Sequence, residues 1–392
     1  MSVDKSWADT IILCVSGIVA FGVSIWLTPF LRNWAVTRGW VVPPSPRRVH
    51  VNPTPRIGGL AIYLSFVFAI IAGIAISFLL IAAGLFKGQF WLGDDLWRII
   101  LLLLGSLPIA VISTIDDIKE LSPLPRLLSH FLGAAIIVVP QVLYPTGRPG
   151  VLIDIINNPF GGIIRLGDIP ILALIITLVW IVGMMNTINW IDGLDGLSGG
   201  IVFIAAIMLF LENLLGGRNA EHGYQWQFTS ALIAVVLAAS IAGFLPFNWH
   251  PASIFMGDSG AMFLGFALGV LSIIDGAKLA TVLLVVGLPV MDAIWVVLYR
   301  LYNRRSAGKA DKSHIHHRLL EMGYSQRQIV LFFYALTIIF GLVGIMPITQ
   351  EPWIKFLALV VLVILLLPII LYSVYYHPRN RKPNQQEQKQ DL

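Results

Sequence analysis

The stretch Asn186-Thr187-Ile188-Asn189-Trp190-Ile191-Asp192-Gly193-Leu194-Asp195-Gly196-Leu197-Ser198-Gly199-Gly200 interrupts two apolar runs, residues 169–185 before it and 201–211 after it. Lipid cannot satisfy the backbone groups of an irregular polar segment, so such a segment between two spans must lie in water or line a cavity. Asp192 and Asp195 are three residues apart and would share one face of a helical turn. The glycines allow close approach of backbone or of a phosphate. The alternative is a plain glycine-rich turn between two membrane spans.

The composition indicates a membrane protein. The 392 residues are 57% hydrophobic and 12% charged, against roughly 25% charged in an average soluble domain. The mean hydropathy is +0.83. The single cysteine, Cys14, lies in the first apolar run, which excludes a disulfide framework and a cysteine metal site. The amino terminus lacks the basic start and small-residue cleavage site of a secretory signal, so we expect the first helix to be retained.

Segments of roughly 20 apolar residues predict membrane-spanning helices. We therefore predict an all-α polytopic membrane protein with about eleven transmembrane helices, near residues 10–31, 57–84, 98–114, 126–143, 169–186, 199–214, 228–246, 259–274, 279–301, 328–347 and 353–376. Residues 1–376 form one transmembrane domain, and the basic, polar tail 377–392 is expected to be disordered. The longest outer loop predicts a small β-hairpin, with strands at 151–156 and 163–166 around a turn at 157–162.

Positive charge is distributed unevenly over the loops. Most of the 26 Lys and Arg residues fall in the first, third and ninth loops and in the tail. Because Lys and Arg concentrate in cytoplasmic loops, we expect the amino terminus outside, and these loops and the carboxyl terminus in the cytoplasm. The acidic motifs and the histidine cluster fall on the same, cytoplasmic side.

Two acidic motifs suit a divalent cation. Asp116 and Asp117 are adjacent, with Glu120 three residues on, at the end of the third predicted span. Magnesium is a hard cation that prefers carboxylate and phosphate oxygens. Asp258 stands between glycines in Met256-Gly257-Asp258-Ser259-Gly260 at a helix start, where a metal-bound phosphate would meet free N–H groups. The alternatives are an ordinary charged helix end for the first motif and a simple N-cap for Asp258.

Two basic motifs suit an anion. Thr54-Pro55-Arg56-Ile57-Gly58-Gly59 places Arg56 and a glycine pair at a helix start, although a loop touching anionic lipid is the alternative. His314-Ile315-His316-His317-Arg318 has a spacing that suits no common structural zinc site, so a clamp for a polyanionic substrate is the better interpretation. Asp292 lies inside the ninth predicted span, and acids within membranes are functional candidates; a buried packing acid is its alternative.

These five ordered motifs, from Thr54 to Leu320, resemble those of the polyprenyl-phosphate N-acetylhexosamine-1-phosphate transferases. The resemblance implies that a bacterial plasma-membrane enzyme transfers the sugar-1-phosphate of a UDP-N-acetylhexosamine to undecaprenyl phosphate in the lipid bilayer and releases UMP. It also implies a Mg²⁺ cofactor, with Mn²⁺ as a substitute, and a homodimer. The histidine segment matches the N-acetylglucosamine branch rather than the muramoyl-pentapeptide branch, which favours UDP-N-acetylglucosamine. No nucleic-acid partner is expected.

Residue roles follow from the same resemblance. Asp258 matches the magnesium ligand, Asp116 the acid proposed as general base, and Asp117 its partner near the metal; Asp117 and Asp192 are further catalytic and metal-binding acids. The substrate-binding positions implied are Arg56, Asn186, Asn189, Gly193, Leu194, Asp195, His314, His316, His317 and Arg318. Two positions depart from the family pattern: Glu120 replaces a common Asp, and His130 stands where a glutamine is expected.

Three other functions are the alternatives. A muramoyl-pentapeptide transferase of the same family is the main one. A membrane prenyltransferase also uses aspartate-rich magnesium motifs, but it would need two similar aspartate motifs and no histidine-arginine segment. A secondary transporter would place charges in broken helices at the middle of the bilayer, and only Asp292 and His130 fit such a position.

Overall fold

Helices occupy nearly every apolar run of the chain, because a backbone surrounded by lipid must satisfy its polar groups within its own segment. In this computed structural model the described residues are 4–42, 53–84, 94–144, 150–216, 228–274, 278–302, 314–346 and 352–375. The predicted disordered tail, 377–392, lies outside these ranges.

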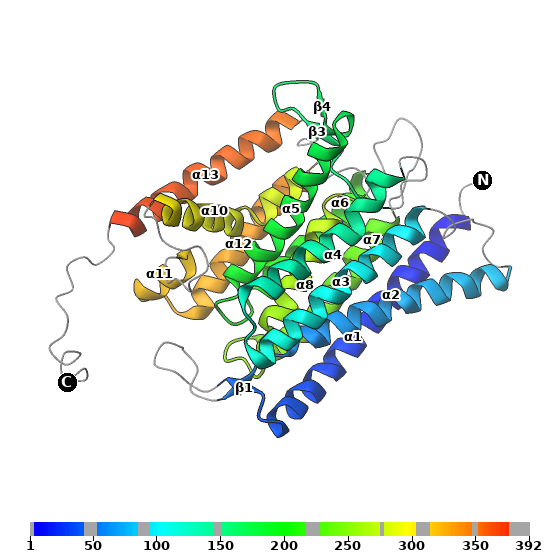
Figure 1. Cartoon of the computed structure of the whole chain (residues 1–392), viewed down its shortest axis with the longest axis horizontal. Helices are drawn as coiled ribbons and strands as arrows, with labels where there is room; N and C mark the ends of the chain where they lie inside the picture. The colour runs from blue at the N-terminus through cyan, green and yellow to red at the C-terminus, as the bar shows by residue number, and fades with distance from the viewer. Residues whose placement is uncertain are drawn as a thin grey trace.

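The described part of the chain contains long helices, short helices and two pairs of short strands (Figure 1). The long helices are α1 (Asp4–Thr37), α2 (Gly58–Ala82), α3 (Asp94–Lys119), α4 (Pro123–Leu143), α5 (Pro170–Ile191), α6 (Leu197–Gly216), α7 (Phe228–Asn248), α8 (Gly257–Leu271), α10 (Gly287–Tyr302), α12 (Gln326–Ile345) and α13 (Pro352–Tyr375). The short elements are β1 (Val41–Val42), β2 (Thr54–Pro55), β3 (Ile155–Asn157), β4 (Ile163–Arg165), η1 (Leu166–Asp168), α9 (Leu279–Val285) and α11 (Ile315–Glu321).

Each of the eleven predicted apolar segments is helical, which confirms an all-α polytopic membrane protein. The count of eleven spans is not confirmed. Among the described residues, eight helices are long and apolar enough to cross a membrane, or nine if the bent pair α9–α10 counts as one. Helix α8 has only 15 residues and lies inside the bundle, where neighbouring helices cover almost all of its surface. Its apolarity therefore reflects protein packing as much as contact with lipid.

The ninth predicted span is broken. Helices α9 and α10 meet at an angle of 82°. Pro289 explains the position of the break: its ring would clash with the carbonyl of Val285, four residues earlier, and it has no N–H to donate. Helix α9 accordingly ends at Val285 and α10 begins at Gly287. The break turns α10, which carries Asp292, away from the axis of α9.

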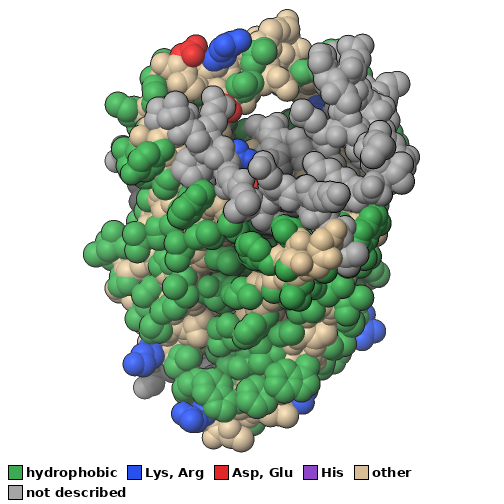
Figure 2. All heavy atoms as spheres, turned by 90° about the vertical axis from the view of Figure 1, so that its right-hand side faces the viewer, with side chains coloured by type: hydrophobic (Ala, Val, Ile, Leu, Met, Phe, Trp, Pro, Cys, Tyr) green, Lys and Arg blue, Asp and Glu red, His purple; other side chains and the backbone are tan. Residues whose placement is uncertain are grey.

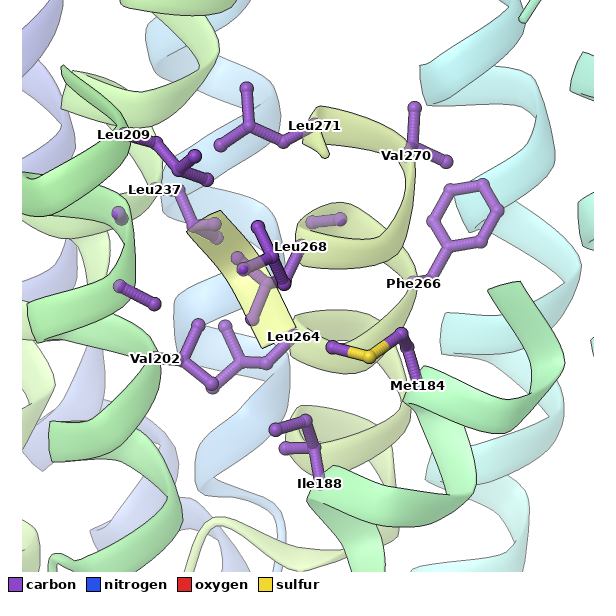
Figure 3. Close-up of a cluster of buried hydrophobic side chains, with 14 of the residues drawn as sticks. Met184, Ile188, Val202, Leu209, Leu237, Leu264, Phe266, Leu268, Val270 and Leu271 are labelled. Carbon is purple, nitrogen blue, oxygen red and sulfur yellow. The ribbon is translucent and has the colours of Figure 1, made fainter. Parts of the chain in front are cut away.

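The core surrounds α8. Its side chains pack against those of α5, α6 and α7, for example Leu264 and Leu268 beside Met184, Val202 and Leu237 (Figure 3). Close approach to α5 depends on Gly265, where a Cβ atom would stand 2.5 Å from the Cα of Met185. This packing fixes the start of α8 relative to the end of α5.

Short strand pairs mark opposite ends of the bundle (Figure 1). At one end β1 pairs antiparallel with β2, with Val41 opposite Pro55 and Val42 opposite Thr54. At the other end β3 pairs antiparallel with β4, with Ile155 opposite Arg165 and Asn157 opposite Ile163. Hydrophobic side chains dominate the lower part of the face seen in Figure 2, and Lys and Arg side chains gather toward its lower edge. This distribution is typical of a protein surrounded by lipid.

Candidate active site

Backbone hydrogen bonds join the Thr54–Gly59 motif to the Met256–Gly260 motif. Phe255 donates its N–H to the carbonyl of Pro55 at 2.8 Å, and Gly58 donates to the carbonyl of Phe255 at 3.0 Å. Gly59 then donates to the carbonyl of Met256 at 2.7 Å. Two motifs that the sequence places about 200 residues apart therefore form one continuous backbone unit at the starts of α2 and α8.

Glycines permit this contact. Gly257 has a φ of +73°, and a Cβ atom there would stand 2.0 Å from the carbonyl oxygen of Arg56. At Gly59 a Cβ atom would stand 1.9 Å from the backbone nitrogen of Gly260. Any larger residue would separate the two helix starts, so the glycines of both motifs are explained by backbone packing.

Asp117 caps α8. Its Oδ1 accepts the N–H of Asp258 at 2.8 Å and its Oδ2 accepts the N–H of Ser259 at 2.9 Å. The first N–H groups of a helix have no partner within the helix, and a carboxylate there also interacts favourably with the helix dipole. Asp117 thereby ties the end of α3 to the start of α8.

Asp258 and Asp116 lie on either side of one guanidinium group. Arg126 Nη1, from α4, is 3.2 Å from Asp116 Oδ2 and 3.4 Å from Asp258 Oδ2. The other oxygen of Asp258 accepts from the side-chain amide of Asn189 at 3.0 Å. The other oxygen of Asp116 accepts the N–H of Leu121 at 2.5 Å. Residues from α3, α4, α5 and α8 therefore meet around Asp258.

Asp192 ends α5 beside this cluster. The hydroxyl of Ser198 donates to its Oδ1 at 2.5 Å. Removal from solvent raises the pKa of the Asp192 carboxyl from 3.8 to about 7, and the negative charges of Asp258 and Asp195 act in the same direction. The Ser198 hydrogen bond and the charge of Arg56 oppose this shift. A carboxyl in such surroundings favours the arrival of a cation, which would restore its ionised form.

Asp195 has a different surrounding from Asp192. Its side chain is buried, and its Oδ2 lies 2.8 Å from His250 Nδ1 and accepts the N–H of Ala252 at 3.1 Å. Asn248 reinforces the same junction, since its amide accepts from Gly196 N–H and donates to the carbonyl of Ile254, each at 3.0 Å. Asp195 thus fastens the glycine-rich turn to the segment that leads into α8.

The histidine segment packs on the other side of that turn. The rings of His314 and His316 are stacked, with centroids 5.8 Å apart, and the ring of His317 lies 4.3 Å from that of His316. A Cβ atom at Gly193 would stand 2.3 Å from His316 Nε2. Burial lowers the pKa of His316 well below 6.5, aided by the neighbouring histidines. His316 is therefore a neutral ring at pH 7.

The structure also places three further residues that were predicted to bind substrate: Leu194, Asn186 and Arg318. Leu194 is buried in the core. The amide of Asn186 donates to the carbonyl of Val182 within its own helix at 2.7 Å. Arg318 lies in the first turn of α11, where its N–H bonds to the carbonyl of His314. The structure thus turns the Asn186 amide toward its own helix, whereas it gathers the following at one end of the bundle: Arg56, Asp116, Asp117, Asn189, Asp192, Gly193, Asp258 and the histidine segment.

The oxygen donors at this end fit a hard divalent cation that also binds substrate. Within the described ranges, no group of three or more His, Cys, Asp or Glu side chains is arranged to hold a metal ion by itself. Magnesium usually takes one or two carboxylates and completes its shell with water and substrate phosphates. Asp258, about a quarter exposed, and Asp192 have this chemistry, whereas both oxygens of Asp117 already accept backbone N–H groups.

The sequence analysis assigned no role in the site to Arg126 or His250. Arg126 counts there only as one of the cytoplasmic charges, although its guanidinium joins two of the predicted catalytic acids. The sequence did hold a signal for this role: Arg126 lies one turn into α4, directly after the Asp116 motif. His250 lies near the fourth motif in the sequence, but its contact with Asp195 depends on a fold that brings residues 55 positions apart together.

Comparisons with known proteins identify relatives of this chain by sequence. The model of the family described as "Glycosyl transferase family 4" matches residues 99–275. A probable undecaprenyl-phosphate N-acetylglucosaminyl 1-phosphate transferase of Bacillus subtilis is 32% identical over 88% of the chain and 89% of the relative. A decaprenyl-phosphate N-acetylglucosaminephosphotransferase of Mycolicibacterium smegmatis is 31% identical over 82% of the chain and 79% of the relative. A phospho-N-acetylmuramoyl-pentapeptide-transferase of Moorella thermoacetica is 38% identical, but the match covers only 30% of the chain and 36% of the relative.

The helical bundle is that of a multi-pass membrane protein, and the relatives matched over most of its length are sugar-phosphate transferases. Similarity over 89% and 79% of the length of two such transferases identifies the family. The chain belongs to the polyprenyl-phosphate N-acetylhexosamine-1-phosphate transferases, within glycosyl transferase family 4.

Proposed function

We propose that the protein transfers N-acetylglucosamine-1-phosphate from UDP-N-acetylglucosamine to undecaprenyl phosphate, forming undecaprenyl-diphospho-N-acetylglucosamine and UMP. This would be the first membrane step of a cell-envelope glycopolymer. The observation that carries the proposal is the cluster of Asp116, Asp258 and Arg126 at one end of a membrane bundle. The extent of the similarity favours the N-acetylglucosamine branch, because muramoyl-pentapeptide relatives match only about a third of the chain.

The chemistry requires two anions to meet. A lipid phosphate oxygen attacks the β-phosphorus of the donor, and the bond from that phosphorus to the oxygen of UMP breaks. The charges of Arg126, which contacts Asp116 and Asp258, and of Arg56, which acts on Asp192, would offset the repulsion together with Arg318 of the histidine segment. Such charge stabilisation is commonly the largest catalytic contribution. His316 is neutral and would act through packing or hydrogen bonding, so charge at the histidine segment would come from its neighbours.

Mg²⁺, or Mn²⁺ in its place, would be held by Asp258 and Asp192 together with donor oxygens. When bound, it would supply charge neutralisation at the diphosphate. We assign Asp117 mainly to holding the start of α8 in place for Asp258, because its two oxygens accept the N–H groups there.

Asp116 is proposed to position rather than to deprotonate the acceptor. A phosphate monoester has a second pKa of about 6, so much of the lipid phosphate is already a dianion near pH 7. The contacts of Asp116 with Arg126 and Leu121 N–H also suit a fixed positioning group. An Asp116→Asn variant should retain most of its activity at about pH 8.5, well above that second pKa; a uniform loss at every pH would instead indicate an essential carboxylate.

The sequence also supports a placement in the bacterial plasma membrane. Loop charge favours an external amino terminus, with the active site and carboxyl terminus in the cytoplasm. The family resemblance further implies a homodimer. Cysteines introduced singly at Lys5 and Lys389 in a Cys14→Ala background would test the orientation: a membrane-impermeant maleimide should label only the first in intact cells.

Purified protein with Mg²⁺, UDP-N-acetylglucosamine and undecaprenyl phosphate should release UMP and form a lipid-linked sugar. Asp258→Ala should abolish both, whereas Asp168→Ala, which removes an exposed carboxylate at the hairpin end, should leave both unchanged. UDP-N-acetylmuramoyl-pentapeptide tests the alternative branch. Absence of UMP release with every UDP-N-acetylhexosamine would refute the proposal.

A further inference from the structure

Asp292, on the broken helix α10, is a buried carboxylate that the proposed chemistry does not use. Its side chain is almost completely enclosed, and both of its oxygens have partners. Oδ2 lies 2.8 Å from His314 Nδ1, and Oδ1 accepts the N–H of Ile315 at 3.0 Å. A buried charge is costly unless it is paired and hydrogen-bonded. These two contacts therefore hold the start of α11 against α10.

The carboxylate also sets the state of the His314 ring. An ionised carboxylate only accepts hydrogen bonds, so the proton of a neutral His314 ring resides on Nδ1. The remaining nitrogen, Nε2, is then an acceptor. The ring also stacks on His316, with an angle of 10° between the planes.

His316 lies between His314 and the Gly193 turn of the candidate active site. It is 1% exposed, and neither ring nitrogen has a hydrogen-bond partner among the described residues. Packing alone therefore sets its position, between the rings of His314 and His317 and the backbone of Gly193. Gly193 adjoins Asp192, so a contact path leads from Asp292 through two histidine rings to the candidate metal site.

We propose that Asp292 is a positioning residue that orients His314 and, through it, seats the histidine segment on the Gly193 turn for binding of the sugar nucleotide. The inference rests on the proposed function for the identity of the substrate. It assigns the bend at Pro289 a purpose: the bend carries Asp292 to the start of α11. The effect should fall on donor binding more than on the chemical step.

Asp292→Asn is the informative change because the side chain keeps its shape while one of its two oxygen acceptors becomes an NH₂ donor. The amide oxygen can still accept the Ile315 N–H, whereas its NH₂ group would face His314 Nδ1 and favour the tautomer protonated on Nε2. We expect the KM for UDP-N-acetylglucosamine to rise on the order of tenfold, since hydrogen bonds to charged groups are strong, with kcat changed less than about threefold.

A readout independent of activity is the ¹⁵N spectrum of histidine-labelled protein, which contains eight histidines. The His314 signals are assigned by their loss in His314→Gln. The wild type should show His314 protonated on Nδ1, and Asp292→Asn should show it protonated on Nε2. An Nε2-protonated His314 in the wild type would overturn the proposal.

Glu212→Gln is the matched control. Glu212 is also a buried carboxylate, and it accepts from Thr281 Oγ1 at 2.9 Å and from Lys355 Nζ at 3.3 Å, on α6 far from the histidine segment. This variant should leave the donor KM and the His314 signals unchanged. In a His314→Gln background, Asp292→Asn should raise KM no further, because coupled residues are not additive.

An equal rise of KM in both backgrounds would show that Asp292 acts independently of His314 and would overturn the inference. So would an unchanged KM in Asp292→Asn. If the wild type used no UDP-N-acetylhexosamine, the proposed function would fail, and the histidine spectra would still decide whether Asp292 sets the state of His314.

Discussion

The carboxylate of Asp117 accepts the backbone N–H of Asp258, 141 residues later in the chain, at 2.8 Å. One predicted catalytic acid thereby holds the backbone of another. The same carboxylate accepts the N–H of Ser259, so the placement of the Asp258 side chain depends on α3 as well as on α8. Adjacent acids in one motif therefore have separate tasks: Asp116 faces Arg126, and Asp117 supports a helix start.

Asp117→Ala should lower stability as well as activity. Leaving buried N–H groups without a partner costs about 1–3 kcal/mol, and the loss of the cap would free Asp258 to move. Thermal unfolding in detergent should show a lower midpoint for Asp117→Ala than for Asp258→Ala, which removes no cap. Equal midpoints for the two variants would argue that Asp117 has no structural task.

Gly193→Ala should impair activity without unfolding the protein. The added methyl group would stand 2.3 Å from His316 Nε2 and push the histidine segment away from the turn. Displacements of about 1 Å near reacting groups can cost on the order of 100-fold in rate, so we expect a loss of kcat/KM of roughly 10- to 100-fold. Gly183→Ala is the control, because nothing lies within 4 Å of the position that its methyl group would occupy; similar losses in both variants would contradict the assignment.

Gly257→Ala should destabilise the protein more than Gly323→Ala. Both glycines have positive φ, +73° and +95°, so both variants carry the strain of a left-handed conformation, about 1–2 kcal/mol. Only at Gly257 would the methyl group also meet backbone, 2.0 Å from the carbonyl oxygen of Arg56. The difference between the unfolding midpoints of the two variants measures how much the contact between the Thr54–Gly59 and Met256–Gly260 motifs contributes to stability. Equal midpoints would show that this contribution is small.

Divalent-cation binding should weaken as the pH falls below about 7. The pKa of Asp192 is raised to about 7, so below that pH the carboxyl is protonated and a cation must displace the proton. Calorimetry of Mg²⁺ binding at a pH of about 6.5, in two buffers of different ionisation enthalpy, should reveal this proton release. The release should disappear in Asp192→Asn, while persistence of the full release in that variant would assign the proton elsewhere.

Apolar run lengths predicted most of the fold, because lipid permits little except helices. The break at Val286 was not predicted, since Pro289 lies in an uninterrupted apolar run and only its clash with the carbonyl of Val285 ends α9 there. Helix α8 was predicted as a span from composition alone. Its burial within the bundle depends on packing against α5, which no local pattern reveals.

The motifs predicted a candidate site, but the contacts between its residues required the structure. Asp192 and Asp195 are three residues apart, yet they have different partners: Asp195 contacts His250, and Asp192 contacts Ser198. Asp116 and Asp258 meet through Arg126, which no motif contained. Such pairings join residues far apart in the chain, and the sequence carries no direct signal for them.

The backbone bonds between residues 55–59 and 255–256 also bear on biosynthesis. While the ribosome is still making the later helices, the early ones enter the membrane with Asp117 lacking the N–H groups it will eventually accept. These N–H groups exist only after the chain has grown past Ser259. A nascent protein interrupted before that point would hold the Asp117 carboxylate without its cap at the end of α3.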